Sequence, residues 1–156
     1  MKYLVIILAL VLISIVGCVS SEDIERTNTQ MPDDVTWISP GKVEVSRFHP
    51  GAEADHLVSI HNGDTSDKEF KVFVQSPSRA RDGYTPATPE MLSWAHIDSS
   101  VVSVTGCSTV DVPVTLLMPE NTEAPDQWEF WVVCADNDPS GIIVTQLASR
   151  WLVEMR

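Results

Sequence analysis

Alternation of apolar and polar residues with a period of two is the feature that most constrains how this chain can fold. The segments EFKVFVQ (69–75) and TVDVPVTLLM (109–118) place apolar side chains at every second position. Successive side chains of an extended strand point to opposite faces, so this pattern is typical of strands buried on one face. The segment QWEFWVVCA (127–135) is apolar at both parities, which indicates a central strand.

The same alternation recurs between turn signals along the rest of the chain. Strands are predicted at 41–46, 55–60, 69–75, 101–105, 109–118, 127–135 and 142–153. Only TPEMLSWAHI (88–97) could form a helical turn, and it could equally be a strand edge. These elements predict an all-β chain folded as a sandwich of seven or eight strands. Pro113 lacks an N–H group within its strand, which predicts an edge strand or a bulge there.

The order of strands and turns resembles a known family over residues 38–153. The segments SPGKVEVSRFHPG, VSIHNGD, FKVFV and WAHIDSSVVSVTGCSTVDVPVTLLMPE are similar to immunoglobulin-like modules of prokaryotic surface proteins and to PapD-like chaperone domains. The resemblance implies an immunoglobulin-like fold. It does not name a function, because such sandwiches serve adhesion, structural and binding roles alike.

The N-terminus has the features of an export signal. Lys2 is followed by the 14-residue apolar run YLVIILALVLISIV, which is short for a membrane span of about 20 residues. The residues from Ile15 to Cys18 resemble the bacterial lipobox, which implies a signal peptide over 1–17 and a diacylglycerol on Cys18. An uncleaved short anchor and conventional cleavage remain alternatives. All three place the rest of the chain outside the cytoplasm.

Residues 18–36 are predicted to be the lipidated Cys18 followed by a flexible acidic tether, and 37–156 to be the folded domain. The tether sequence VSSEDIERTNTQMPDDVT has no sustained period and is rich in polar residues. The chain has a formal charge of −12, and removal of a leader with one Lys and no acid leaves −13. Such a charge repels nucleic acid, so no nucleic-acid partner is expected.

With Cys18 assigned to lipid, Cys107 and Cys134 remain. An even number of remaining cysteines in an oxidising compartment favours a disulfide between them. The alternative is two unpaired thiols, with Cys134 buried in its strand.

No pattern of catalytic or metal-ligating residues is present. The sequence lacks Gly-x-Ser-x-Gly and a phosphate-binding loop, so the protein is not expected to be an enzyme or to hold a cofactor. His49, His56 and His61 are close in sequence, but a loop and opposed parities scatter them, so no metal site is predicted.

Aromatic residues supply the candidate ligand contacts. Trp131 is predicted on the strand face opposite Trp128, with Trp151 as its neighbour on the following strand and Tyr84 in the long 76–90 loop. An exposed set of this kind could stack on sugars or seat a protein, or the loop could simply cover it.

Three hypotheses for function follow. The first is a non-catalytic, membrane-anchored, extracytoplasmic structural or protein-binding module, whose partner is a protein or a cell-envelope polymer. The second is a carbohydrate-binding module that uses exposed tryptophans. The third is a subunit of an envelope assembly that pairs through an edge strand.

Overall fold

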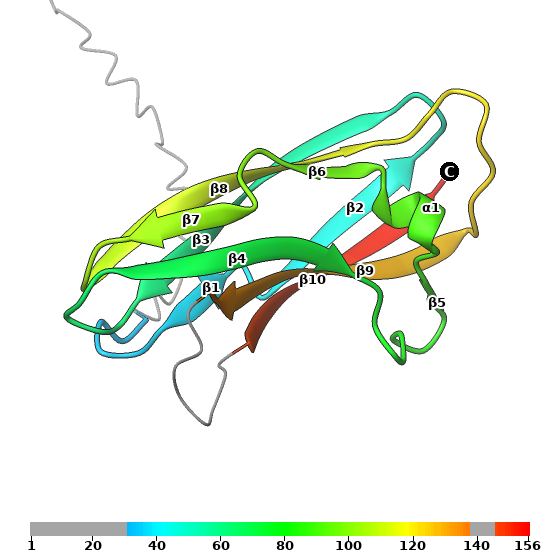
Figure 1. Ribbon diagram of the computed structural model, residues 1–156. Helices are drawn as coiled ribbons and strands as arrows, with labels where there is room; N and C mark the ends of the chain where they lie inside the picture. Colours follow the sequence, from blue (N-terminus) through cyan, green and yellow to red (C-terminus); the bar gives the residue numbers. More distant parts are fainter. Residues whose placement is uncertain (1–30, 138–145) are drawn as a thin grey trace, which may run out of the picture. The chain divides into compact units, whose positions relative to one another are not determined.

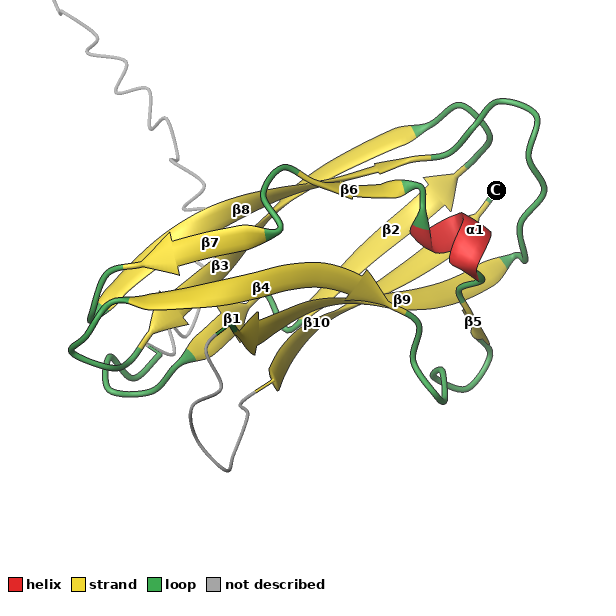
Figure 2. Cartoon of the chain, in the orientation of Figure 1, coloured by secondary structure: helices red, strands yellow, loops and turns green. Residues whose placement is uncertain are grey.

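The computed structural model describes residues 31–137 and 146–156, so the predicted signal peptide and Cys18 lie outside the described residues. The described part of the chain is a sandwich of two β-sheets with one short helix, α1 (Pro89–Leu92), before β6 (Figures 1 and 2). The predicted all-β, immunoglobulin-like fold class is therefore confirmed. Among these residues, no helix has the length and hydrophobicity of a membrane span.

The first sheet has four strands and the second has six. The four-stranded sheet has the order β1 (Trp37–Ser39), β3 (Glu53–Asn62), β8 (Ser108–Leu117), β6 (Ala95–Ile97). The six-stranded sheet has the order β2 (Lys42–Phe48), β10 (Gln146–Met155), β9 (Gln127–Asp136), β4 (Lys68–Gln75), β7 (Val101–Val104), with β5 (Thr85–Pro86) also paired to β9. Two pairings are parallel, β2 with β10 and β5 with β9, and the others are antiparallel.

The described residues form ten strands, more than predicted, partly because two of the short links between the sheets divide an extended stretch into two strands. At Pro40–Gly41 the chain leaves β1 of one sheet and enters β2 of the other. Between Ile97 and Val101 it leaves β6 of the four-stranded sheet and enters β7 of the six-stranded sheet. Strands that switch sheets close the corners of a sandwich.

The core between the sheets is built around three stacked aromatic rings. The rings of Trp128 and Phe130 lie 5.6 Å apart, and those of Phe130 and Trp151 lie 5.3 Å apart. Trp94, which follows α1, meets Trp128 edge-on at 5.9 Å. The predicted inward faces of 69–75 and 109–118 are confirmed, since their alternate apolar residues are buried or half-buried.

β8 is a central strand, but among the described residues its β6 side is unpaired at Pro113, so the strand is an edge at that position, as predicted. β8 lies between β3 and β6, but β6 pairs only with Val114 to Leu116. The amide of Leu117 donates to the Trp94 carbonyl at 2.9 Å, on the β6 side of β8. Peptide groups alternate in direction along an antiparallel strand, so the nitrogen of Pro113 also faces that side, beyond the end of β6. The missing N–H therefore costs no ladder hydrogen bond.

The predicted disulfide is not formed, and both cysteines are free thiols. Cys107 is exposed in the turn between β7 and β8, with its sulfur 3.7 Å from the Asp64 carbonyl. Cys134 points into the core from β9 and is 1% exposed. Cys107 lies in a turn outside both sheets, whereas Cys134 lies within the six-stranded sheet and faces the core.

Cys107 is expected to react with a maleimide in the folded protein, whereas Cys134 should react only after denaturation. Intact mass after labelling, with and without denaturant and without reductant, measures both. In the lipidated protein, whose Cys18 thiol is blocked, a Cys107→Ser variant should show no labelling in the folded state. If neither thiol of the denatured, unreduced protein reacted, the two cysteines would be bonded after all.

The buried thiol of Cys134 makes the stability of the fold depend on pH in the alkaline range. Burial, with a smaller contribution from the charge of Asp136, raises the pKa of Cys134 from 9.0 to about 12. The folded protein then keeps a proton that the unfolded chain loses above pH 9. The free energy of unfolding should therefore fall by up to about 1.4 kcal/mol per pH unit between pH 9 and 12. A Cys134→Ala variant should lack this part of the pH dependence.

The end of the predicted tether packs against the sandwich. The unit that contains the sandwich begins at Met31, and the Asp33 carbonyl lies 2.9 Å from Nε2 of His61. The Trp37 ring stacks on buried His61 with 5.0 Å between centroids. A Cβ on Gly63 would lie 2.4 Å from the backbone of Val35, so only glycine allows this close approach.

Candidate functional site

The outer face of the six-stranded sheet carries a partly exposed apolar row. Phe73 on β4, Val133 on β9 and Ala148 on β10 lie side by side, and Trp131 is the outward residue next to Val133 on β9. The side chain of Phe73 is 36% exposed and that of Trp131 is half-buried. A shallow hollow of about 140 Å³ lies among Gln75, Trp131, Val133, Gln146 and Ala148. We call these residues and Phe73 the Trp131 face.

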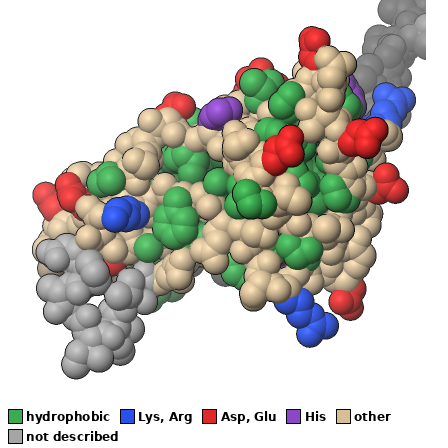
Figure 3. Space-filling model, turned by 45° about the vertical axis from the view of Figure 1, so that its right-hand side comes forward, with side chains coloured by type: hydrophobic (Ala, Val, Ile, Leu, Met, Phe, Trp, Pro, Cys, Tyr) green, Lys and Arg blue, Asp and Glu red, His purple; other side chains and the backbone are tan. Residues whose placement is uncertain are grey.

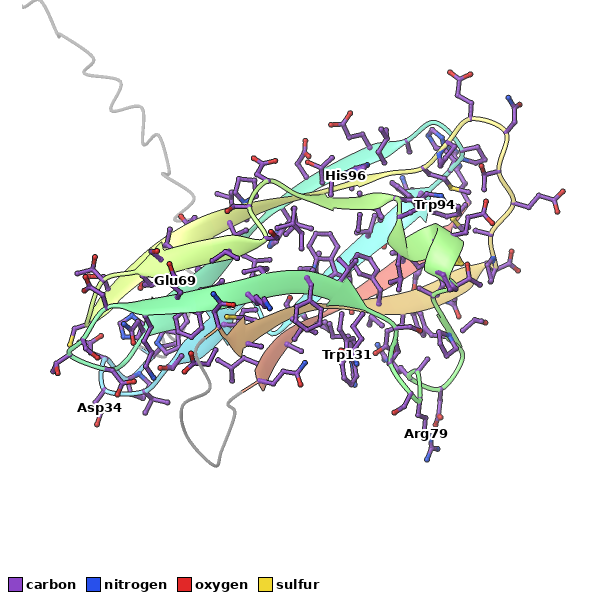
Figure 4. All side chains as sticks on the ribbon, viewed as in Figure 1. Asp34, Glu69, Arg79, Trp94, His96 and Trp131 are labelled. Atoms are coloured by element: carbon purple, nitrogen blue, oxygen red, sulfur yellow. The ribbon has the colours of Figure 1, made fainter. Side chains whose placement is uncertain are left out.

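The figures show how this surface is presented. Trp131 projects from the outer side of the sheet, on the side of the loop that carries Arg79 (Figure 4). In the view of Figure 3, hydrophobic side chains form separate patches with acidic side chains among them, rather than one continuous apolar surface.

A buried carboxylate positions Trp131. Glu129 is 0% exposed although it points outward from β9. Its side chain accepts hydrogen bonds from Trp131 Nε1 at 2.7 Å, Arg150 Nε at 2.9 Å and the backbone amide of Arg81 at 2.7 Å. A buried charge is tolerated when it is paired and its oxygens are hydrogen-bonded, and both conditions are met here.

The 76–88 loop is bound to the same face through further contacts. The Tyr84 hydroxyl donates to Glu154 Oε1 at 2.6 Å, and this hydrogen bond raises the pKa of Tyr84. The Ala87 amide donates to the Glu129 carbonyl at 2.8 Å. Leu152, outward on β10, is only 1% exposed. The loop belongs to the sandwich and covers the part of the sheet next to the Trp131 face.

The structure separates the three aromatic residues that the sequence grouped together. Trp151 pairs with Phe130 across β9 and β10, points into the core and is 0% exposed, so the prediction of a surface contact at Trp151 was wrong. The outward neighbour of Trp131 on β10 is Arg150. The hydroxyl of Tyr84 is already bound to Glu154. Tyr84 is half-buried, as Trp131 is, so these two residues stay candidate contacts.

Sequence reasoning missed Glu129. The available signal was one acidic residue within the otherwise apolar segment QWEFWVVCA (127–135). An acidic residue at an outward position of a central strand is normally predicted to be exposed to solvent. Only the loop from 76 to 88, folded back over the sheet, buries it.

The described residues offer no group of side chains suited to a metal ion. Within residues 31–137 and 146–156, no three His, Cys, Asp or Glu side chains are grouped so that they could hold a metal ion. His49 is exposed near a turn, His56 meets the Trp151 ring edge-on at 6.0 Å, and His61 bonds to the Asp33 carbonyl.

Comparison with known proteins identifies the fold. No protein-family model and no curated protein sequence matches the chain. Among solved structures, the periplasmic chaperone SfaE aligns with a TM-score of 0.54 and 10% identity, covering 78% of this chain and 58% of SfaE. A chain from a chaperone–tip adhesin complex of CFA/I fimbriae gives a TM-score of 0.56, 11% identity and coverage of 78% and 57%.

A single-domain match agrees with these two. PapD-like domain 7 of human CEP192 aligns with a TM-score of 0.52 and 12% identity, covering 81% of this chain and 89% of that domain. This chain spans a little more than half the length of the first chaperones it matches. At these identities the likeness shows a shared PapD-like, immunoglobulin-like sandwich fold, as the sequence resemblance predicted.

Proposed function

We propose that the protein is a lipid-anchored, extracytoplasmic PapD-like module that binds a protein partner without catalysis. The observation that carries the binding role is the Trp131 face, where Phe73 and Trp131 present apolar area on a rigid sheet. Aromatic residues of this kind are enriched in protein interfaces. The hydrogen bond from Trp131 to buried Glu129 holds the ring in one orientation before a partner arrives, which reduces the entropy cost of binding.

The proposed location rests on the N-terminal sequence. Residues 1–17 serve as the signal peptide, Cys18 carries the lipid, and the polar residues from 19 onward serve as the tether. The structural neighbours support the extracytoplasmic part of this proposal, since SfaE is a periplasmic chaperone.

The carbohydrate hypothesis is not taken further. It depended on Trp131 and Trp151 forming one aromatic platform, and Trp151 lies in the core with 0% exposure. A single half-buried ring whose indole N–H is already bound offers little area for stacking on a sugar.

Site-specific photocrosslinking in the native cells tests the binding role. A photoreactive amino acid at Phe73 is expected to give a discrete protein adduct, because this side chain is exposed on the Trp131 face. The same amino acid at Glu120, an exposed loop position, is the control. Trp131→Ala in the Phe73-labelled protein should weaken the adduct. A protease-resistant adduct, or equal adducts at both positions, would contradict a specific protein partner.

A further inference from the structure

Among residues 31–137 and 146–156, two strand edges are unpaired on either side of a groove at the corner where β6 ends. The groove measures about 310 Å³ and is lined by residues of β7 and β8 with Asp98 and Ser99. In the described part of the chain, β8 has no partner on the β6 side from Thr109 to Pro113, because β6 pairs only from Val114 onward.

The direction of the backbone groups at this edge follows from bonds that are formed. Met118 exchanges hydrogen bonds with Gly51 and Ala52 on the β3 side, whereas the Leu117 amide donates to Trp94 on the β6 side. Peptide groups alternate along the strand. Odd-numbered residues of β8 therefore face the groove, and the N–H and C=O groups of Thr109 and Asp111 are available there with the C=O of Pro113.

β7 forms the opposite wall. The amide of Val72 donates to the Ser100 carbonyl at 2.9 Å, so even-numbered positions of β7 face β4. By the same alternation, the peptide groups of Val101 and Ser103 face the groove. The wall is apolar as well, since Val101 is 40% exposed and Val102 is half-buried.

A second hollow lies on the outer face of the same strand. It measures about 390 Å³ and is lined by Asp55, His56, Leu57, Pro113 and Val114. Leu57 is 54% exposed and lies directly across from Pro113. Pro113 lines both the hollow and the groove, so a strand added beside β8 would place alternate side chains near each of them.

We propose that the free edge of β8 binds an extended, basic peptide segment of a partner protein, which continues the line of β6 as an added β-strand. Backbone hydrogen bonds to Thr109, Asp111 and Pro113 supply affinity, and the groove and hollow accept alternate side chains. This inference names a site and a peptide chemistry for the proposed protein-binding role, at a surface separate from the Trp131 face.

Charge decides in favour of a basic partner. The groove and hollow carry Asp98, Asp111 and Asp55, and their described linings include no Lys or Arg. Asp111 is exposed and accepts one hydrogen bond, from Ser59 at 2.6 Å, so its carboxylate has capacity for a cation. A second copy of this chain would bring acid against acid at this edge, which is unfavourable.

The chain's own N-terminal segment is excluded for the same reason. Residues 19–30 contain Glu22, Asp23 and Glu25 with Arg26 as the one basic residue, and they show no alternation. Pro113 also constrains the register of the bound peptide against β8. Its C=O can accept a hydrogen bond from the peptide, but it has no N–H to donate one.

Amide hydrogen exchange by NMR tests the proposal on the full folded domain. In the free protein, the amides of Thr109 and Asp111 should exchange at least about 10-fold faster than those of Val110 and Val112, which are bonded to β3. Saturation with the capped heptapeptide KVTVKVT should slow exchange at Thr109 and Asp111 by about 10-fold. The matched peptide EVTVEVT should not, and neither should KVPVKVT, which lacks a backbone donor.

Three variants separate the contributions. Asp111→Asn keeps the edge N–H and removes the charge, so peptide affinity should fall several-fold. Asp111→Pro blocks the edge and should abolish binding with little loss of thermal stability, because the nitrogen at 111, like that at Pro113, faces away from β3. Trp131→Ala should leave peptide binding unchanged.

The possible outcomes decide between occupants. Equal binding of the acidic and basic peptides, no binding of either, or protection confined to Val101 and Ser103 would overturn the assignment to β8. Concentration-dependent protection of Thr109 and Asp111 without peptide would identify a second copy instead. Failure of the peptide test together with a specific adduct at Phe73 would reject this site and leave the proposed protein-binding role standing.

Discussion

Replacing Arg150 with Met is expected to lower the free energy of unfolding by up to about 3–5 kcal/mol, the cost of leaving a buried charge without its partner. Glu129 is 0% exposed, and Arg150 Nε at 2.9 Å supplies its neutralising charge. Met fills similar volume but leaves the carboxylate buried with only the Trp131 indole and the Arg81 amide as donors. Urea denaturation followed by tryptophan fluorescence measures the loss.

Replacing the other partner of the ion pair, Glu129, should lower the free energy of unfolding by less. Glu129→Gln removes the charge from the buried side, and Arg150, whose side chain is 44% exposed, can turn to water. A loss of about 1–3 kcal/mol is expected, as for an imperfectly replaced buried hydrogen bond. The double variant should be more stable than Arg150→Met alone, because it carries no buried charge. Equal costs for the two single variants, or additive costs in the double variant, would show that Glu129 does not depend on Arg150.

This asymmetry bears on function because Glu129 connects the sheet, the loop and Trp131. Loss of its charge should release the 76–88 loop at Arg81 and allow the Trp131 ring to reorient. We therefore expect Glu129→Gln to weaken the Phe73 adduct even though Glu129 itself touches no partner. In the proposed binding role, Glu129 positions Trp131.

Replacing Cys18 with Ser is expected to remove the lipid and stop processing at that residue. Two acyl chains are the number needed for stable anchoring, and each buried CH₂ contributes about 0.8 kcal/mol, so no contact of the folded domain could compensate for their loss. Mass spectrometry of the membrane-extracted wild-type protein should give a chain that begins at Cys18 with an added diacylglycerol. The variant should lack that mass.

Membrane partitioning alone would be ambiguous for this variant, since an unprocessed leader could hold the chain in the bilayer. The mass distinguishes the cases. A wild-type chain that retains residues 1–17 without lipid would identify an uncleaved anchor. A chain that begins at another small residue without lipid would identify simple secretion. Cys107→Ser is the matched control and should change neither processing nor acylation.

The fold was largely predictable because the apolar positions within each strand indicate which face of that strand is buried. In 69–75 and 109–118, one parity is apolar and the structure buries that parity. The sequence of 88–97 is compatible with a helical turn or a strand edge, and the segment contains both, with α1 capped by Thr88 and β6 after it. The short strands β1 and β5 were missed, because two or three residues are too few to show a period.

The candidate site was less predictable. Trp131 was placed correctly on the outward face by its parity within 127–135. Trp151 was not, because its position relative to Trp131 depends on the register between β9 and β10, and the sequence of either strand is compatible with more than one register. The disulfide failed for a similar reason, since an even count of cysteines says nothing about their separation.

The sequence by itself determined that this chain forms a β-sandwich and carries a lipobox-like leader, because alternation and the leader pattern are local properties read within a few residues. Tertiary structure decided what the outer faces present: a glutamate buried beneath a loop, a tryptophan held by that glutamate, and an unpaired edge of β8 beyond β6. These features arise where segments distant in sequence meet, as at Arg81 with Glu129 and at Trp94 with Leu117. Such meetings depend on strand order and register, which hydrophobic periodicity does not encode.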